Sequence, residues 1–193
     1  MLNGVSVQKD GNSVLQVNVL STSLLSLLLL PLLVQTGRTF PESRPHLVLL
    51  SSNIHGGAKL KERNAENTLE TLNDKKTWEE SKAGVSERYA VSKLFDLYVS
   101  IELAGLAPLI DGEPAVIVDS VAPGFCKSEL LSREPGVPWL LKVLEYLTAR
   151  TVQEGSKTIV DAAMRRKDAH GKYLSHQEIA WYVLFLFHDS RFL

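Results

Sequence analysis

The sequence predicts an α/β fold, in which helices cover a parallel sheet in three layers. Helical segments alternate with short apolar runs along the chain, as they do in proteins with parallel sheets. RPHLVLLSS, at 44–52, is a short apolar run that ends in small polar residues, and PAVIVDSVAPGF, at 114–125, is a second mostly apolar run; both are typical of strands buried on both faces. The 193 residues, 45% of them hydrophobic, suffice for a single domain with a core.

The first predicted element is an apolar helix over residues 16–34. Its segment 19–34, VLSTSLLSLLLLPLLV, is free of charge and suggests a membrane span. It is shorter than the ~20 residues that a span needs, and it contains Pro31, three serines and a threonine. A mostly polar stretch precedes it, unlike the start of a signal peptide. We therefore expect a buried helix and no membrane span.

A buried strand follows and ends on Ser51 and Ser52. Residues 59–83 are charged and weakly periodic, which predicts a solvated insertion with some helix. The next helix, over 89–104, ends near Gly105, a typical C-cap residue. Its apolar positions recur every three or four residues: Val91, Leu94, Leu97 and Ile101.

The second half of the chain continues the alternation of strand and helix. The strand at 114–125 runs into a Pro-Gly turn, and residues 137–148 predict a short amphipathic helix. A further helix spans 151–164, where Thr151 and Glu154 form a capping-box pattern. The final predicted strand is HGKYLS, at 170–175, and an apolar tail, 181–193, ends a single domain, 1–193.

Tyr89 and Lys93 stand four residues apart on their helix and therefore share one face. A cation beside a phenol lowers the phenol pKa from about 10, so that the phenol can exchange a proton near neutral pH. Alternatively, both side chains extend into solvent from buried stems. The carboxyl ends of parallel strands are where sites form, and Ser52 and Pro123-Gly124 each end a predicted strand.

The order of Ser52, Tyr89 and Lys93 along the chain resembles the active-site pattern of the short-chain dehydrogenases/reductases. That family builds its active site from Asn, Ser, Tyr and Lys, the last two in a Y-x-x-x-K motif. The resemblance runs through VNVLS, LLSSNIH, YAVSK and VAPGFCKSEL and covers about residues 1–180. S-S-x-x-H, with the long insertion, is similar to the branch that contains retinol dehydrogenases and the WW-domain oxidoreductase. GKYLSHQEIA resembles the G-K-Y-x-S segment of related enzymes.

The resemblance implies a Rossmann-like fold and an NAD(P)-dependent oxidoreductase. The expected substrate is a ketone or secondary alcohol that is hydrophobic and polyketide-like, as in secondary metabolism. Tyr89 would be the general acid or base, and Lys93 would lower its pKa and bind the nicotinamide ribose. Ser52 would hold the substrate oxygen, and Asn18 would keep a water in the proton relay.

The same resemblance implies a site for NADP or NAD. Pro123 and Gly124 would shape the nicotinamide pocket, and Ser128 would contact the carboxamide or a phosphate. The full set of cofactor-binding residues is Asn18, Tyr89, Lys93, Pro123, Gly124 and Ser128.

The glycine-rich turn of the family is missing from this sequence. Full members begin with a strand and a G-x-x-x-G-x-G turn that cradles the cofactor phosphates. None of the twelve glycines has that spacing. The resemblance therefore implies an N-terminally truncated short-chain dehydrogenase fold, without the first three strands and most of the fourth. Two alternatives remain open: a non-catalytic paralogue that binds no cofactor, and a cofactor-free cyclase or isomerase that reuses Ser52, Tyr89 and Lys93.

The composition narrows the choice of partners. A net charge of −1, with 22% charged residues, argues against nucleic-acid binding. The single cysteine, Cys126, excludes an internal disulfide and agrees with a cytoplasmic location. The five histidines lack metal-ligand spacing, so no metal is expected. The resemblance also implies a homodimer through helices 16–34 and 89–104.

Overall fold

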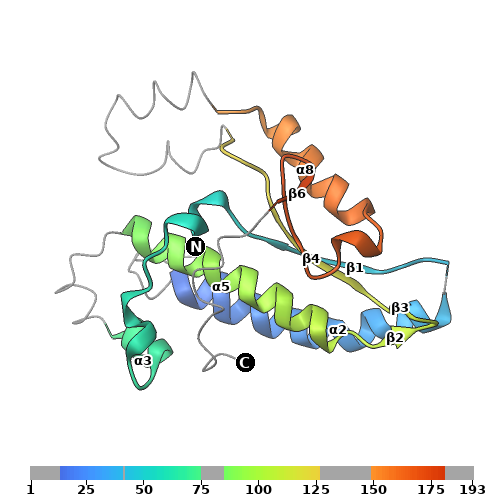
Figure 1. Cartoon of the computed structure of the whole chain (residues 1–193), viewed down its shortest axis with the longest axis horizontal. Coiled ribbons are helices and arrows are strands. Elements are labelled where there is room, and N and C mark those ends of the chain that lie inside the picture. The colour runs from blue at the N-terminus through green and yellow to red at the C-terminus, as the bar shows by residue number, and fades with distance from the viewer. Residues whose placement is uncertain (1–13, 41, 75–84, 127–148, 181–193) are drawn as a thin grey trace, which may run out of the picture.

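The computed structural model describes residues 14–40, 42–74, 85–126 and 149–180, and the statements below concern these residues. It has three layers (Figure 1), with two long helices on one face of a sheet and one helix on the other. The four-stranded sheet has the order β1-β4-β5-β6. The strands are β1 (His46–Leu50), β4 (Ile117–Ala122), β5 (Tyr173–Ser175) and β6 (Glu178–Ala180). The two long helices are α2 (Thr22–Thr39) and α5 (Val85–Leu106), and the helix on the other face is α8 (Val152–Met164).

The predicted α/β fold with a mostly parallel sheet is confirmed. β4 is parallel to both β1 and β5, and all six of its residues are buried. β1 lies at the edge of the described sheet, where Leu50 is opposite Val121. The carboxyl ends of β1 and β4 therefore lie side by side.

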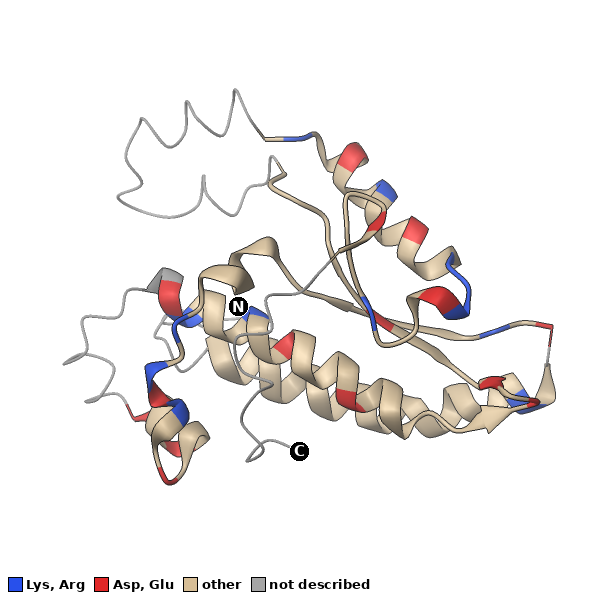
Figure 2. Cartoon of the chain, in the orientation of Figure 1, with Lys and Arg blue, Asp and Glu red and all other residues tan. Residues whose placement is uncertain are grey.

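The first helix forms where the sequence predicted it, but it is not buried. It begins with a π-helical segment, η1 (Gln16–Ser21), and continues as α2 past Pro31. No charged residue lies between Gly11 and Gly37, so α2 is almost uniformly tan in Figure 2. One side packs on α5 and β1, and the opposite side is open. The residues with large exposed apolar side chains are Val17, Leu20, Leu24, Leu25, Leu27, Leu28, Leu29 and Leu32.

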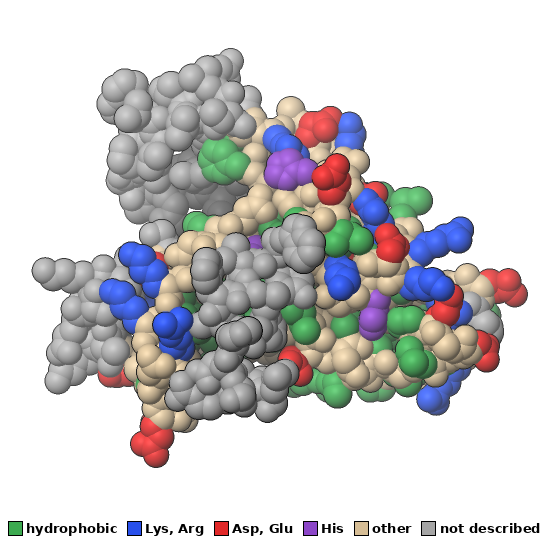
Figure 3. Space-filling model, viewed as in Figure 1, with side chains coloured by type: hydrophobic (Ala, Val, Ile, Leu, Met, Phe, Trp, Pro, Cys, Tyr) green, Lys and Arg blue, Asp and Glu red, His purple; other side chains and the backbone are tan. Residues whose placement is uncertain are grey.

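Among the described residues, Gln16–Thr39 is long and apolar enough to cross a bilayer, and 17% of its most apolar window is buried. In the view of Figure 3, hydrophobic side chains follow the lower border, where α2 and α5 lie, whereas charged side chains gather over α8. The expectation of a buried helix is therefore wrong for the chain by itself, because apolarity shows that a helix can be buried but not what buries it.

The charged insertion is less solvated than the sequence predicted. It contains η3 (Lys61–Asn64) and α3 (Thr68–Asn73), whose N-cap Asn67 accepts a hydrogen bond from the Glu70 amide. Leu60 and Leu72 are buried and join a core cluster with residues of α5 and η1. Residues 75–84 lie outside the described residues.

Two hairpins were not predicted. β2 (Leu109–Ile110) and β3 (Glu113–Pro114) form a small antiparallel pair after α5. β6 turns back antiparallel to β5, so the predicted final strand is followed by one more. The predicted helix at 137–148 and the apolar tail at 181–193 lie outside the described residues.

The helix α8 begins as the capping-box pattern predicted. The Thr151 hydroxyl accepts a hydrogen bond of 3.2 Å from the Glu154 amide. The helix packs on β4 and β1 and encloses Asp119 of β4, which is 0% exposed. Neither carboxylate oxygen of Asp119 has a hydrogen-bond partner among the described residues. Burial therefore raises the pKa of Asp119 to about 7.

Candidate active site at the carboxyl end of β1

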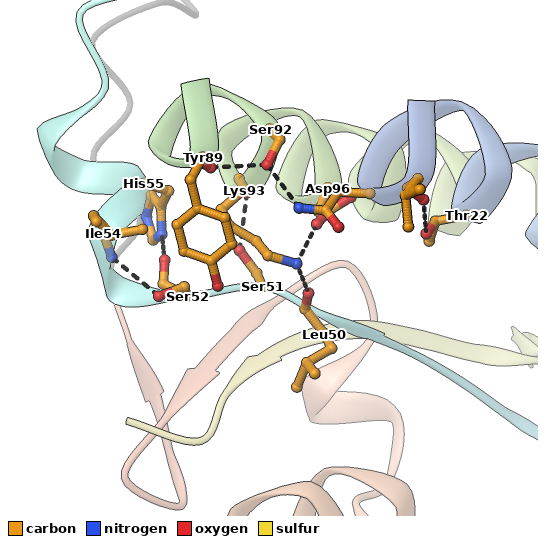
Figure 4. Close-up of polar contacts among 12 residues, drawn as sticks. Thr22, Leu50, Ser51, Ser52, Ile54, His55, Tyr89, Ser92, Lys93 and Asp96 are labelled. Carbon is orange, nitrogen blue, oxygen red and sulfur yellow. Dashed lines mark hydrogen bonds and ion pairs between the residues drawn. The ribbon is translucent and has the colours of Figure 1, made fainter. Parts of the chain in front are cut away.

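The predicted Ser, Tyr and Lys meet where β1 ends. Figure 4 shows Tyr89 and Lys93 on α5 facing the chain at Ser51 and Ser52. The Ser51 hydroxyl donates a hydrogen bond of 2.9 Å to the Lys93 carbonyl, which ties the end of β1 to this turn of α5. Lys93 Nζ lies 5.8 Å from the centroid of the Tyr89 ring. The two residues therefore share one face of the helix, as their spacing predicted.

The Lys93 ammonium is buried and held from two sides. It donates hydrogen bonds of 2.8 Å to the Leu50 carbonyl and of 2.8 Å to Asp96 Oδ2. The Ser51 amide points to Val121 of β4, and backbone groups alternate along a strand, so the Leu50 carbonyl points to the outer edge of the sheet. An ammonium has three N–H donors. Within the described residues these two contacts leave one N–H donor of Lys93 without a hydrogen-bond acceptor.

Asp96 is the counter-ion of Lys93, and sequence reasoning missed it. Asp96 is 2% exposed, and burial raises the pKa of its carboxylate while the hydrogen bond from Lys93 opposes the shift. The signal for Asp96 was present, because Lys93 and Asp96 stand three apart on a predicted helix and so lie on one face.

Asn18 reaches the site through one intermediate residue. It lies in the π-helical segment η1, and such segments often mark functional sites. Its Nδ2 donates a hydrogen bond of 3.0 Å to Ser92 Oγ, which donates one of 2.8 Å to the Tyr89 carbonyl. Asn18 therefore supports the turn of α5 that carries Tyr89, and no described contact joins it to Lys93.

Ser52 caps the short 3-10 helix η2 (Asn53–Gly57) that follows β1. Its hydroxyl accepts a hydrogen bond of 3.4 Å from the Ile54 amide. Its carbonyl lies 2.6 Å from His55 Nδ1, so this nitrogen carries the hydrogen. In Figure 4 the Ser52 side chain lies on the side of α5 that presents Tyr89.

Pro123 and Gly124 lie at the same end of the sheet, just after β4. Gly124 has φ +83°, a conformation that glycine adopts without strain, and an added Cβ would lie 3.8 Å from the Arg150 side chain. The loop is fixed by a hydrogen bond of 2.8 Å from the Arg150 amide to the Phe125 carbonyl. No described contact joins this loop to Tyr89 or Lys93. Ser128 lies outside the described residues.

This geometry suits proton exchange with an oxygen. A phenol, a buried ammonium and a hydroxyl lie on adjoining elements, and each can donate a hydrogen bond. Positioned donors of this kind stabilise negative charge that develops on a substrate oxygen.

The curated proteins that this chain resembles are described as short-chain dehydrogenases or reductases. The chain is 35% identical over 178 residues to the short chain dehydrogenase/reductase dmxR8 of Cryptosporiopsis sp., covering 89% of this chain and 51% of the relative. It is 37% identical over 181 residues to the short chain dehydrogenase atnD of Emericella nidulans, covering 89% and 55%. It is 34% identical over 173 residues to the short-chain dehydrogenase anuD of Penicillium roqueforti, covering 86% and 43%.

The chain thus spans about half the length of the curated relatives that it matches. No family model matches it. No solved structure matches it either.

Proposed function

Because the chain belongs to the short-chain dehydrogenase/reductase family, we propose that it is an oxidoreductase that interconverts a ketone and a secondary alcohol with NADP or NAD. The observation that carries the proposal is that Tyr89 and Lys93 lie on the turn of α5 that Ser51 binds at the carboxyl end of β1, next to Ser52. Function collects at this end of a parallel sheet.

The residues present fit the nicotinamide and ribose end of the cofactor. Lys93 keeps an N–H donor beside Tyr89 for a ribose hydroxyl, and Gly124 leaves the loop after β4 without a side chain. When bound, the cofactor would supply the hydride in reduction and accept it in oxidation. The twelve glycines do not form the turn that cradles the phosphates in the family, so the fit is restricted to this end.

Each polar side chain then has a separate task. Tyr89 gives a proton to the substrate oxygen during reduction, or removes one during oxidation. Lys93 provides the positive charge next to the phenol, and Ser52 donates a hydrogen bond to the same oxygen. Asn18 supports the Tyr89 turn through Ser92 and is the candidate to hold a water of the proton relay.

We also propose a hydrophobic, polyketide-like substrate. Ile54 follows Ser52 directly in η2, and Phe125 follows Gly124 in the neighbouring loop. Their side chains are 40% and 48% exposed. Exposed apolar side chains on both strand-end loops would contact an apolar ring system beside the reacting oxygen.

We further propose that the protein is cytoplasmic and pairs with a second copy through α2 and α5. The exposed leucines of α2 support this, because contiguous apolar surface of this kind marks interaction sites. A dimer would bury the helix without a bilayer.

The test is hydride transfer by the full chain. Purified protein is mixed with NADPH or NADH and α-tetralone, an aromatic ketone probe, and loss of absorbance at the nicotinamide band is followed. Tyr89→Phe removes only the phenolic hydroxyl and should lower the rate at least ~100-fold. The matched control is Tyr98→Phe, on the same helix, which should retain the rate.

Other results would point elsewhere. If the wild-type chain shows no saturable binding of either nucleotide, the oxidoreductase proposal fails. Nucleotide-independent conversion of a polyketide that is lost in Tyr89→Phe would instead support a cyclase or isomerase.

A further inference from the structure

Two sequence motifs meet beside the site, and apart from Ser52 the proposed function leaves their residues without a role. S-S-x-x-H comprises 51–55, and G-K-Y-x-S comprises 171–175. Asn53 Oδ1 accepts a hydrogen bond from the Tyr173 hydroxyl and another of 3.1 Å from Ser175 Oγ. These contacts join the loop after β1 to β5 across about 120 residues of sequence.

The donors in this cluster have defined directions. Tyr173 is 2% exposed, and burial raises its pKa to about 12, so its hydroxyl donates at any assay pH. Ser175 has a single hydroxyl hydrogen, which it gives to Asn53. It therefore accepts from His176 Nδ1, 2.8 Å away. The chain of donation runs from His176 through Ser175 to Asn53.

The same tyrosine also holds the loop at a second point. The His55 ring meets the Tyr173 ring edge-on, with centroids 4.8 Å apart and an interplanar angle of 85°. Such aromatic pairs contribute beyond their burial. His55 in turn holds the Ser52 carbonyl through Nδ1. Tyr173 thus contacts the loop on both sides of Ile54.

The Ser52 hydroxyl makes a longer hydrogen bond than the hydroxyl of its neighbour Ser51. Ser51 is fixed by the β4 ladder through its amide and by α5 through its hydroxyl. Ser52 lies beyond β1, and its hydroxyl is held only by the long contact to the Ile54 amide among the described polar contacts. Its placement therefore depends on η2, which packs on α5 and is joined to β5 through Asn53 and His55.

We propose that Asn53 and Tyr173 are positioning residues that fix Ser52 for hydrogen bonding to the substrate oxygen, a role that rests on the proposed function. Neither residue touches the reacting atoms. Loss of the link leaves Tyr89 and Lys93 in place on α5 and displaces only the Ser52 hydroxyl. Misplacement of one donor lowers the rate of the chemical step more than it changes cofactor binding.

The experiment first measures the link without activity. Tyr173→Phe keeps the ring and removes the donor, and Asn53→Ala removes the acceptor. Each single change should raise the equilibrium constant for unfolding, measured by urea denaturation. If the two residues are coupled, the double variant should raise this constant about 3- to 10-fold less than the product of the two single effects. Backbone amides at 52–57 should exchange hydrogen faster in both single variants, and the control Tyr98→Phe should leave them unchanged.

The second measurement is kinetic and is made on the full chain with α-tetralone and NADPH. Tyr173→Phe should lower kcat about 10-fold per folded molecule, with KM for NADPH changed less than twofold. Asn53→Asp, which keeps an acceptor oxygen, should recover most of the rate that Asn53→Ala loses. A purely structural role would lower the folded fraction and not kcat.

The outcomes are distinguishable. Additive effects in the double variant with unchanged amide exchange would overturn the positioning link. So would an active wild type whose kcat is unaffected by Tyr173→Phe. An inactive wild type with coupled variants and faster exchange would overturn the proposed function and leave the physical link established.

Discussion

Replacing Asp119 with asparagine should stabilise the protein, and the gain should grow as the pH rises. Asp119 lies between β4 and α8 with both carboxylate oxygens unpartnered among the described residues. Arg165, whose charge opposes the shift in the Asp119 pKa, makes its hydrogen bonds elsewhere, to Asp161 at 3.0 Å and to the Gln177 carbonyl. Asparagine has almost the same shape and no charge to bury.

The size of the effect follows from the shift in pKa. Burial raises the pKa of Asp119 from 3.8 to about 7, so the folded state resists ionisation. A folded pKa above the unfolded one means that stability is lost as pH rises through this interval. Each unit corresponds to about 1.4 kcal/mol, which gives a cost of about 1.7 kcal/mol at pH 5 and about 4 kcal/mol at pH 8. Asp119→Asn removes this cost and keeps the amide contacts of the strand.

The assay is urea denaturation followed by circular dichroism at pH 5 and pH 8. The stability difference between Asp119→Asn and wild type should be about 2 to 3 kcal/mol larger at pH 8 than at pH 5. The control, Asp168→Asn, alters a carboxylate that is 54% exposed, and should change stability by less than about 1 kcal/mol at both values. An Asp119 difference that is the same at both pH values would refute the reasoning.

Three further predictions concern packing, charge and association. Gly37→Ala should destabilise the protein by about 1–3 kcal/mol in urea titrations, because the added Cβ would lie 2.4 Å from a backbone carbonyl oxygen. The control Gly105→Ala, whose Cβ would meet nothing within 4 Å, should not lower stability, and equal effects of the two changes would contradict this reasoning. Lys93→Met should lower the free energy of unfolding by about 3–5 kcal/mol, because it leaves the Asp96 carboxylate charged and buried without its partner. Adding Asp96→Leu should recover part of this stability, and additive losses in the double variant would show that the two residues are not coupled. Leu28→Glu, at a position 63% exposed on α2, should convert the proposed dimer to a monomer, which light scattering would detect as a halved molar mass. The control Met164→Glu on α8 should leave the mass unchanged, and an unchanged mass for Leu28→Glu would exclude this interface.

The elements that depend on local chemistry could be predicted from the sequence. Thr151 and Glu154 form their cap because both partners lie within one turn. β4 could be predicted because its residues other than Asp119 and Ser120 are β-branched or small and apolar, which suits a strand buried on both faces. Tyr89 and Lys93 share a face because helical spacing alone determines it.

The elements that depend on distant partners could not be predicted. β6 was missed because His176 and Gln177 form the turn between β5 and β6 with φ of 59° and 64°. Two-residue turns with positive φ favour Asn, Asp and Gly, so this pair does not predict one. Leu60 and Leu72 are isolated among charged residues, so their burial depends on contacts with α5 and η1.

The site shows the same limit. The place of Ser52 at the end of a strand could be predicted from the sequence, whereas the hydrogen-bond partners of Asn53 lie about 120 residues away. Spacing within the sequence carries no information about such a contact.

The link between Asn53 and Tyr173 also bears on how the protein matures. A nascent chain leaves the ribosome from its N-terminus, so α2, β1 and α5 emerge long before β5. Until Tyr173 and Ser175 have been synthesised and joined the sheet, the loop with Ser52 lacks its anchors. Contacts of such long sequence separation form slowly, so the candidate site should be completed last, after the rest of the described fold has collapsed.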